Sequence, residues 1–84
     1  MFYHVFSSTF QMPYGESRKH SVNLANIVRF MMSSDPQIIK FFYNNNTVNP
    51  GEFTIMFKDI DERNQQFLNA VTAIETFNNR ATGG

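Results

Sequence analysis

Acid–base or nucleophilic chemistry in this chain of 84 residues would have to come from very few side chains. His4 and His20 are the only histidines, and there is no cysteine to act as a nucleophile or a thiolate ligand. A catalytic histidine needs a partner group within reach in a cleft. His4 stands between Phe2 and Phe6, which predicts a packed, hydrogen-bonded histidine, and His20 ends a polar loop and is expected to face solvent.

Three carboxylates stand close together in the sequence, at Asp59, Asp61 and Glu62. Their spacing matches no familiar metal site, because the glycine and the distal glutamate of a calcium loop are missing. Asp59 and Glu62 do have the spacing of a capping box, in which side chains bind the free N–H groups at a helix start. We therefore expect helix capping here, with no metal, no cofactor and no catalytic residue. An enzyme with a site at a dimer interface, built from His20 and carboxylates, is the third hypothesis.

The polar stretch of residues 13–20 carries a small cluster of positive charge. An aromatic side chain there could stack on an unpaired base, and basic side chains near a helix start could hold phosphate groups. The net charge of the chain is zero, which does not favour nucleic acid. Binding of RNA or single-stranded nucleic acid is therefore the alternative hypothesis, and a solvated loop is the simpler interpretation. The candidate residues are Tyr14, Arg18, Lys19, His20 and Arg29.

Two segments have the alternation of apolar and polar residues that is typical of half-buried strands. They are residues 2–10, where Phe2, Phe6 and Phe10 share one face, and residues 52–57. The connection between them is long enough for either parallel or antiparallel pairing. Two strands alone are marginal in water and leave open edges. This predicts that the sheet grows by pairing with a second copy of the chain across a two-fold axis.

Three helices are predicted from apolar residues that are spaced by three and four positions. The first begins at a Ser21 cap and the second at Asp35 and Pro36, unless the two form one helix that is kinked at Pro36. The third follows the cluster of residues 59–62. The sequence thus predicts a single α+β domain over residues 1–84, with a small two-stranded sheet and three helices in the order β-α-α-β-α, and a frayed tail at residues 81–84.

The second predicted helix is apolar over a broad arc. Methionine and aromatic side chains are enriched at protein interfaces, and three amphipathic helices cannot all bury wide apolar arcs against a two-stranded sheet. We therefore expect a non-catalytic module that forms a homodimer and that binds a partner protein and modulates or inhibits it. The predicted partner interface consists of Met32, Ile39, Phe42 and Tyr43.

No apolar run approaches the roughly 20 residues of a membrane span, and no signal peptide is recognisable. Together with the lack of cysteine, this predicts a cytoplasmic protein without a membrane partner. The abundance of Phe, Asn and Ile suits an AT-rich gene, as is typical of small phage accessory proteins.

Overall fold

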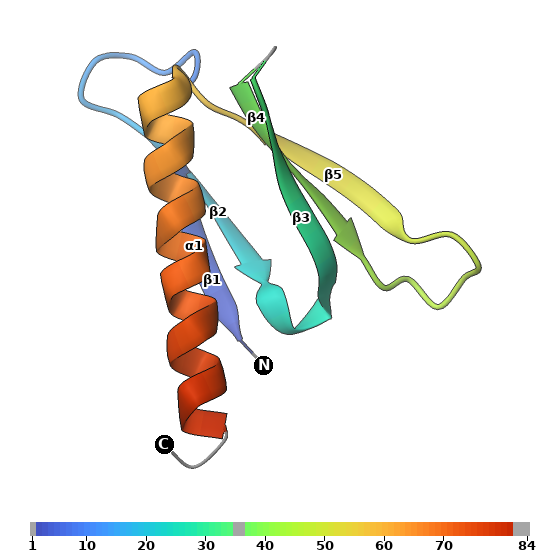
Figure 1. Ribbon diagram of the computed structural model, residues 1–84. Coiled ribbons are helices and arrows are strands. Elements are labelled where there is room, and N and C mark those ends of the chain that lie inside the picture. Colours follow the sequence, from blue (N-terminus) through green and yellow to red (C-terminus); the bar gives the residue numbers. More distant parts are fainter. Residues whose placement is uncertain (1, 35–36, 82–84) are drawn as a thin grey trace.

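The computed structural model describes residues 2–34 and 37–81, and within them it contains five strands, one short 3₁₀ helix and one long α-helix (Figure 1). β1 and β2 form one antiparallel sheet, and β3, β4 and β5 form a second one in that order. We call these sheets the hairpin and the meander. In chain order the elements are β1 (Tyr3–Ser8), β2 (Arg18–Asn23), η1 (Leu24–Asn26), β3 (Ile27–Ser34), β4 (Gln37–Tyr43), β5 (Gly51–Met56) and α1 (Ile60–Ala81).

In the two strands of the hairpin, successive side chains point to opposite faces, as extended backbone requires. Phe6 and Ser8 of β1 point inward and are buried, whereas Tyr3 and Val5 point outward and are exposed. In β2, Val22 is buried and pairs with His4 of β1. The strand predicted at residues 2–10 is therefore confirmed over its central part.

The meander is built on a row of aromatic side chains. Phe41 of β4 pairs with Phe30 of β3 on one side and with Phe53 of β5 on the other. The three rings are stacked, with centroids 5.9 Å apart for Phe30 and Phe41 and 4.7 Å apart for Phe41 and Phe53. Phe6 of the hairpin meets the Phe41 ring edge-on at 5.2 Å, so the two sheets share one core.

The predicted fold class is wrong, because residues 27–34 and 37–43 form strands rather than two helices. Both segments contain apolar residues at helical spacing, but they also alternate between the core and the outside when extended. Their β-branched and aromatic residues favour strands. The chain therefore supplies its own neighbouring strands, and all the pairings are antiparallel. Asp35 and Pro36, the predicted second cap, lie outside the described residues.

Of the three predicted helices, the described residues contain the third alone, as α1. Its start is capped as the sequence indicates, since the Asp59 carboxylate accepts the N–H of Glu62 at 2.8 Å. Its apolar stripe packs toward the core through Phe67, Ala70 and Ile74. The predicted frayed tail falls almost entirely outside the described residues, because α1 extends to Ala81 and residues 82–84 are not described.

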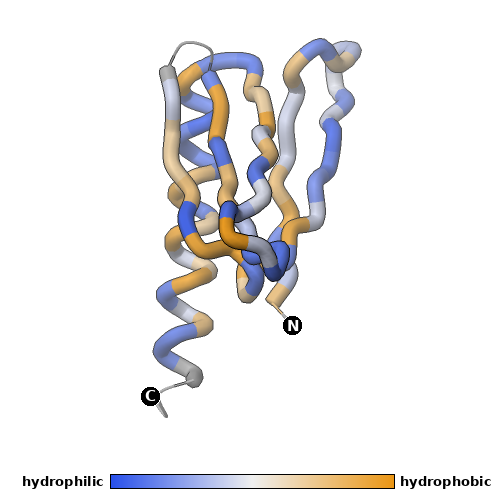
Figure 2. The backbone as a smooth tube through the Cα atoms, turned by 90° about the vertical axis from the view of Figure 1, so that its right-hand side faces the viewer, coloured by the Kyte–Doolittle hydropathy of each residue, from blue (hydrophilic) through white to orange (hydrophobic). Residues whose placement is uncertain are grey.

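Helix α1 bridges the two sheets on one side of the core, where it contacts β1, β3 and β4. Phe67 of the helix lies against Phe30 of β3, with ring centroids 5.0 Å apart. The C-terminal part of the helix continues beyond the sheets (Figure 2). α1 does not cover the opposite side of the core, between β2 and the meander, where the short η1 joins β2 to β3 (Figure 1).

Candidate functional site

The face of the meander that points away from the core is rich in apolar side chains. A sheet that packs one face on the core ordinarily presents polar residues on the other face. Here the exposed fraction is 45% for Met31 and 39% for Met56, while Ile38 and Phe42 are half-buried. We call this surface the outer face, and its residues are Arg29, Met31, Ser33, Ile38, Lys40, Phe42, Glu52, Thr54 and Met56.

The strand register brings the apolar members of the outer face together. Ile38 of β4 lies directly opposite Met56 of β5. Met31 of β3 pairs with Lys40, which places Met31 diagonally next to both Ile38 and Phe42. Diagonal neighbours on one face of a sheet are within reach of long and aromatic side chains. The four apolar side chains therefore form one continuous patch.

Charged side chains surround the Phe42 ring. The guanidinium carbon of Arg29 lies 4.6 Å from the centre of the ring, and Lys40 Nζ lies 5.7 Å from it. Both distances allow a cation–π attraction, which holds the two cations beside the ring. Lys40 Nζ also lies 3.8 Å from Glu52 Oε1. The outer face thus carries an aromatic ring with two cations beside it and one acidic side chain.

The residues predicted as a partner interface are divided between two faces. Phe42 lies on the outer face, but Ile39 is fully buried in the core, so that Ile39 is no part of any surface of this structure. Met32 pairs with Ile39, and Tyr43 contacts Phe53, so both lie on the inner side of the meander. The prediction assumed two helices, with Met32 at the end of the first and the other three residues on the broad apolar arc of the second. In a strand, neighbouring side chains point to opposite faces instead. The predicted interface omits Met56. The alternation of residues 52–57 is the sequence signal that could have identified it, because it places Met56 on the face of the strand that points away from the core.

A groove of about 540 Å³ opens on the side of the core that α1 leaves uncovered. One wall is the β2 strand, and the other is formed by the start of β3 together with Tyr43 and Phe53 of the meander. The Tyr43 and Phe53 rings contact each other with centroids 5.9 Å apart. The lining residues are His20, Ser21, Val22, Asn23, Asn26, Ile27, Tyr43 and Phe53.

The predicted nucleic-acid residues are not brought together into one site. Tyr14 is fully exposed in the loop after β1, and Arg18 and Lys19 are exposed at the start of β2. Lys19 Nζ donates hydrogen bonds to Ser7 Oγ at 2.6 Å and to Ser17 Oγ at 2.8 Å. His20 lines the groove instead of facing outward, and Arg29 belongs to the meander. The prediction placed Arg29 on a helix that follows the loop, and that helix does not form.

Both histidines point toward the interior, and burial lowers the pKa of each one below its ordinary value. For His20 the neighbouring Arg18 lowers the pKa further, because two positive charges repel. The Nε2 atom of His4 is buried without a hydrogen-bond partner in the described part of the chain. The sequence predicts that His4 is packed and hydrogen-bonded. In the structure its ring is packed against Phe6, with ring centroids 4.8 Å apart, but Nε2 lacks the expected hydrogen bond within the described residues.

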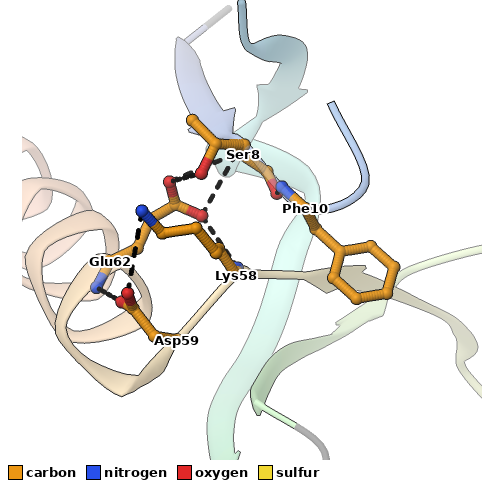
Figure 3. A network of polar contacts seen from close by, with 6 residues as sticks. Ser8, Phe10, Lys58, Asp59 and Glu62 are labelled. Carbon is orange, nitrogen blue, oxygen red and sulfur yellow. Dashed lines mark hydrogen bonds and ion pairs between the residues drawn. The ribbon is translucent and has the colours of Figure 1, made fainter. Parts of the chain in front are cut away.

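Two carboxylates of the acidic cluster, those of Asp59 and Glu62, accept hydrogen bonds from groups of the chain itself (Figure 3). The Glu62 carboxylate accepts hydrogen bonds from the N–H of Lys58 at 3.0 Å, and from the N–H and the hydroxyl of Thr9 at 3.1 Å and 2.5 Å. Burial raises the pKa of Glu62, but these hydrogen bonds outweigh burial and leave the pKa below its ordinary value. Glu62 therefore joins the loop after β1 to the start of α1.

Within residues 2–34 and 37–81, no three histidine or acidic side chains are arranged in a way that could hold a metal ion. The described part of α1 is too polar to be a membrane-spanning helix. Comparisons of this chain with protein families, with curated proteins and with solved structures gave no match. The outer face and the groove are thus the two features of the fold on which a function can be argued.

Proposed function

We propose that this protein is a non-catalytic, cytoplasmic module that binds a partner protein on the outer face of its meander and thereby modulates or blocks that partner. The observation that supports this proposal is the continuous patch of Met31, Ile38, Phe42 and Met56 on the face of the meander that does not pack against the core. Methionine, phenylalanine and arginine are the types of residue that are enriched in the centres of protein interfaces.

The argument for association that the sequence suggests does not apply to this fold. Two strands flanked by helices would need another strand to complete the sheet, but the described residues themselves provide five strands. The free surface of three helices is likewise absent, since the described ranges contain one α-helix and one 3₁₀ helix of three residues. The proposal therefore depends on the outer face and not on an incomplete sheet.

The patch has enough exposed apolar area to contribute to binding. Complete burial of a methionine or phenylalanine side chain is worth about 1.5–3 kcal/mol. Met31 and Met56 are 45% and 39% exposed, so covering each would contribute about 1 kcal/mol. A few anchors of this kind supply most of the affinity of a typical interface.

The charges on the outer face indicate what the partner must offer. Glu52 lies within 3.8 Å of Lys40, whereas Arg29 has no carboxylate partner among the described residues. A guanidinium that is already held against an aromatic ring loses little side-chain freedom when it pairs with an acid. The complementary surface is therefore apolar where it meets Met31, Ile38, Phe42 and Met56, and it carries a carboxylate opposite Arg29.

The experiment that tests this function is capture of proteins from a lysate of the organism that carries the gene. The bait is the wild-type chain, Phe42→Ser or Tyr3→Ser, and half of each sample is treated with nuclease. Tyr3 is exposed on the outward face of the hairpin, so its variant is the matched control. Circular dichroism first verifies that all three baits are folded.

We expect the wild-type chain and Tyr3→Ser to capture the same protein, with or without nuclease, and Phe42→Ser to lose it. Binding of the purified captured protein should then weaken at least tenfold on Arg29→Ala substitution. Equal capture by Phe42→Ser, or capture that nuclease abolishes, would contradict the proposal.

One observation favours the nucleic-acid hypothesis as a second candidate, at a different place from the predicted loop. Phe42 is flanked by Arg29 and Lys40 on an open sheet surface, and an aromatic ring beside cations can stack a base and hold its phosphate. The same experiment separates the two candidates, because binding of a labelled single strand would weaken steeply with salt and would be the nuclease-sensitive result.

A further inference from the structure

Strand β2 has one edge whose main-chain groups have no partner among the described residues. The N–H of Ser7 in β1 donates to Gln66 Oε1 at 2.9 Å, so Ser7 and its opposite residue Lys19 form one of the pairs without mutual hydrogen bonds. Because such pairs alternate along an antiparallel ladder, the N–H and C=O groups of Lys19 and Ser21 point away from β1. No hydrogen bond to these four groups is found within the described residues.

The other edges of the fold are protected to a greater degree. The outer edge of β1 is covered by α1, where Gln66 binds the N–H of Ser7 and Glu62 binds that of Thr9. β3 has an irregular register between Ile27 and Arg29, and such irregularities disfavour pairing with another strand. On β5, the carbonyl of Met56 accepts the hydroxyl of Ser8 at 2.5 Å.

The β2 edge lacks most of these protections. It borders the open groove rather than a helix, and the strand contains neither a proline nor a register shift. Its charges are confined to Arg18 and Lys19 at one end, and the rest of the strand is neutral at pH 7. Natural proteins avoid edges of this kind unless they use them for pairing.

We propose that a second copy of this chain pairs its own β2 with this edge, antiparallel and centred on Ser21, to form a four-stranded sheet with the order β1-β2-β2-β1. In this arrangement Ser21 faces Ser21 of the other copy across the two-fold axis. The two serines exchange their N–H and C=O groups, and Lys19 lies opposite Asn23.

The charges of β2 disfavour the two registers that are centred closer to the start of the strand, on Lys19 and on His20. Centring the pair on Lys19 would place lysine against lysine and Arg18 against His20, which are repulsive pairs directly opposite each other. Centring it on His20 would put the two imidazoles face to face, beside Arg18. The register centred on Ser21 opposes no two basic residues, and on the groove side it places His20 of each copy opposite Val22 of the other.

This dimer is independent of the function proposed above, because it uses the hairpin and leaves the outer face of the meander free. It also gives the groove an occupant, since the added strand borders the space that Val22, Tyr43 and Phe53 line. A variant that separates the two copies should therefore still capture the partner protein, and Phe42→Ser should still be a dimer.

The first test is a cross-link, which the chain permits because it has no cysteine of its own. Opposed residues in a hydrogen-bonded antiparallel pair have Cα atoms about 5.5 Å apart, within the range that a disulfide spans. Under mild oxidation we expect Ser21→Cys to give a covalent dimer, and Lys19→Cys and Thr54→Cys to remain uncrosslinked. A cross-link through Lys19→Cys but not through Ser21→Cys would overturn the register, and one through Thr54→Cys alone would move the interface to β5.

The second test measures mass by light scattering after size-exclusion chromatography. Ser21→Pro removes only an N–H that points away from β1, so the hairpin should persist. Thr54→Pro is the matched control, because its N–H points off the open edge of β5 by the same alternation. We expect wild type and Thr54→Pro at twice the chain mass and Ser21→Pro at the chain mass. The proposal would be overturned if wild type had the mass of one chain at about 100 times the lowest concentration that light scattering detects. That result would decide the matter whatever the masses of the variants.

Discussion

The two halves of α1 are attached to the sheets by different interactions. Along the first half, Glu62 binds Thr9, Gln66 binds Ser7, and Arg63 Nη1 donates to the carbonyl of Ser33 at 2.7 Å. Along the second half, Ile74 packs against the core and Phe77 stacks on Phe2, with ring centroids 4.4 Å apart.

This contrast indicates which interactions determine the position of the helix. Hydrogen bonds are directional and fail when atoms shift by a fraction of an ångström, whereas stacked rings tolerate sliding. The first half should therefore fix the angle of α1 against the sheets, and the second half should mainly add apolar contact. Substitutions at the two ends measure this contrast directly.

The largest effect is expected for Arg63→Ala. Arg63 is 6% exposed, and its removal deletes the hydrogen bond to Ser33 and the buried packing of its aliphatic stem. A hydrogen bond from a charged group is worth about 1.5–3 kcal/mol, so we expect a loss of about 3 kcal/mol in the free energy of unfolding by urea. Arg18→Ala is the control at an exposed position and should change stability by less than about 0.5 kcal/mol. A loss for Arg63→Ala as small as that of the control would refute the role of the first half.

A smaller effect is expected for Glu62→Gln, which keeps the shape of the side chain but removes its charge. One amide oxygen cannot replace two carboxylate oxygens that accept three hydrogen bonds, so the free energy of unfolding should fall by about 2 kcal/mol. Glu75→Gln, exposed on the same helix, is the matched control and should change little. Equal stabilities for the two variants would contradict this interpretation of the network in Figure 3.

The same carboxylate predicts a pH dependence. The pKa of Glu62 is lower in the folded chain than its ordinary value of 4.5, so the unfolded chain binds more protons on acidification. Its contribution to stability is complete above pH 4.5 and is lost as the pH falls through the lowered pKa. Urea midpoints measured from pH 7 to pH 3 should therefore decrease less for Glu62→Gln than for wild type, and parallel curves would argue against the assignment.

The smallest effect is expected for Phe77→Ala. Phe77 is 44% exposed, and an aromatic pair contributes about 0.5–1.5 kcal/mol beyond its buried area, so we expect a loss of about 1 kcal/mol. Hydrogen exchange should become faster in the last turns of α1 and should stay unchanged near Glu62. Leu68→Ala, exposed on the same helix, is the control. Faster exchange along the whole helix would mean that the second half also fixes its position.

Local signals in the sequence are sufficient to predict the type of an element where they favour either a strand or a helix clearly. Residues 2–10 alternate between two faces and are followed by Pro13 and Gly15, and Asp59 precedes a long apolar stripe, so β1 and α1 are predicted near their observed positions. Between residues 21 and 43 the apolar residues are so dense that helical spacing and alternation both fit. The pairing of Phe30, Phe41 and Phe53 decides between them, and that contact joins residues that are distant in the sequence.

The prediction of the interface residues is partly wrong for the same reason. An error between helix and strand leaves the composition of a segment unchanged, but it redistributes the side chains between the core and the surface. The sequence predicts both Phe42 and Ile39 at the partner interface. Phe42 does lie on the outer face, whereas Ile39, three residues before it, is buried. The groove beside β2 could not be predicted at all, because its walls come from strands of two sheets that meet only after folding.

The helix that lies along β1 limits how far the hairpin can extend. A strand bordered by α1 on one flank has a single flank left, so each molecule offers the hairpin sheet one joining position and not two. Units with one such position terminate each other when they meet. Growth through this sheet consequently stops at a pair, and stacking into open-ended fibres by this route is blocked by the position of α1.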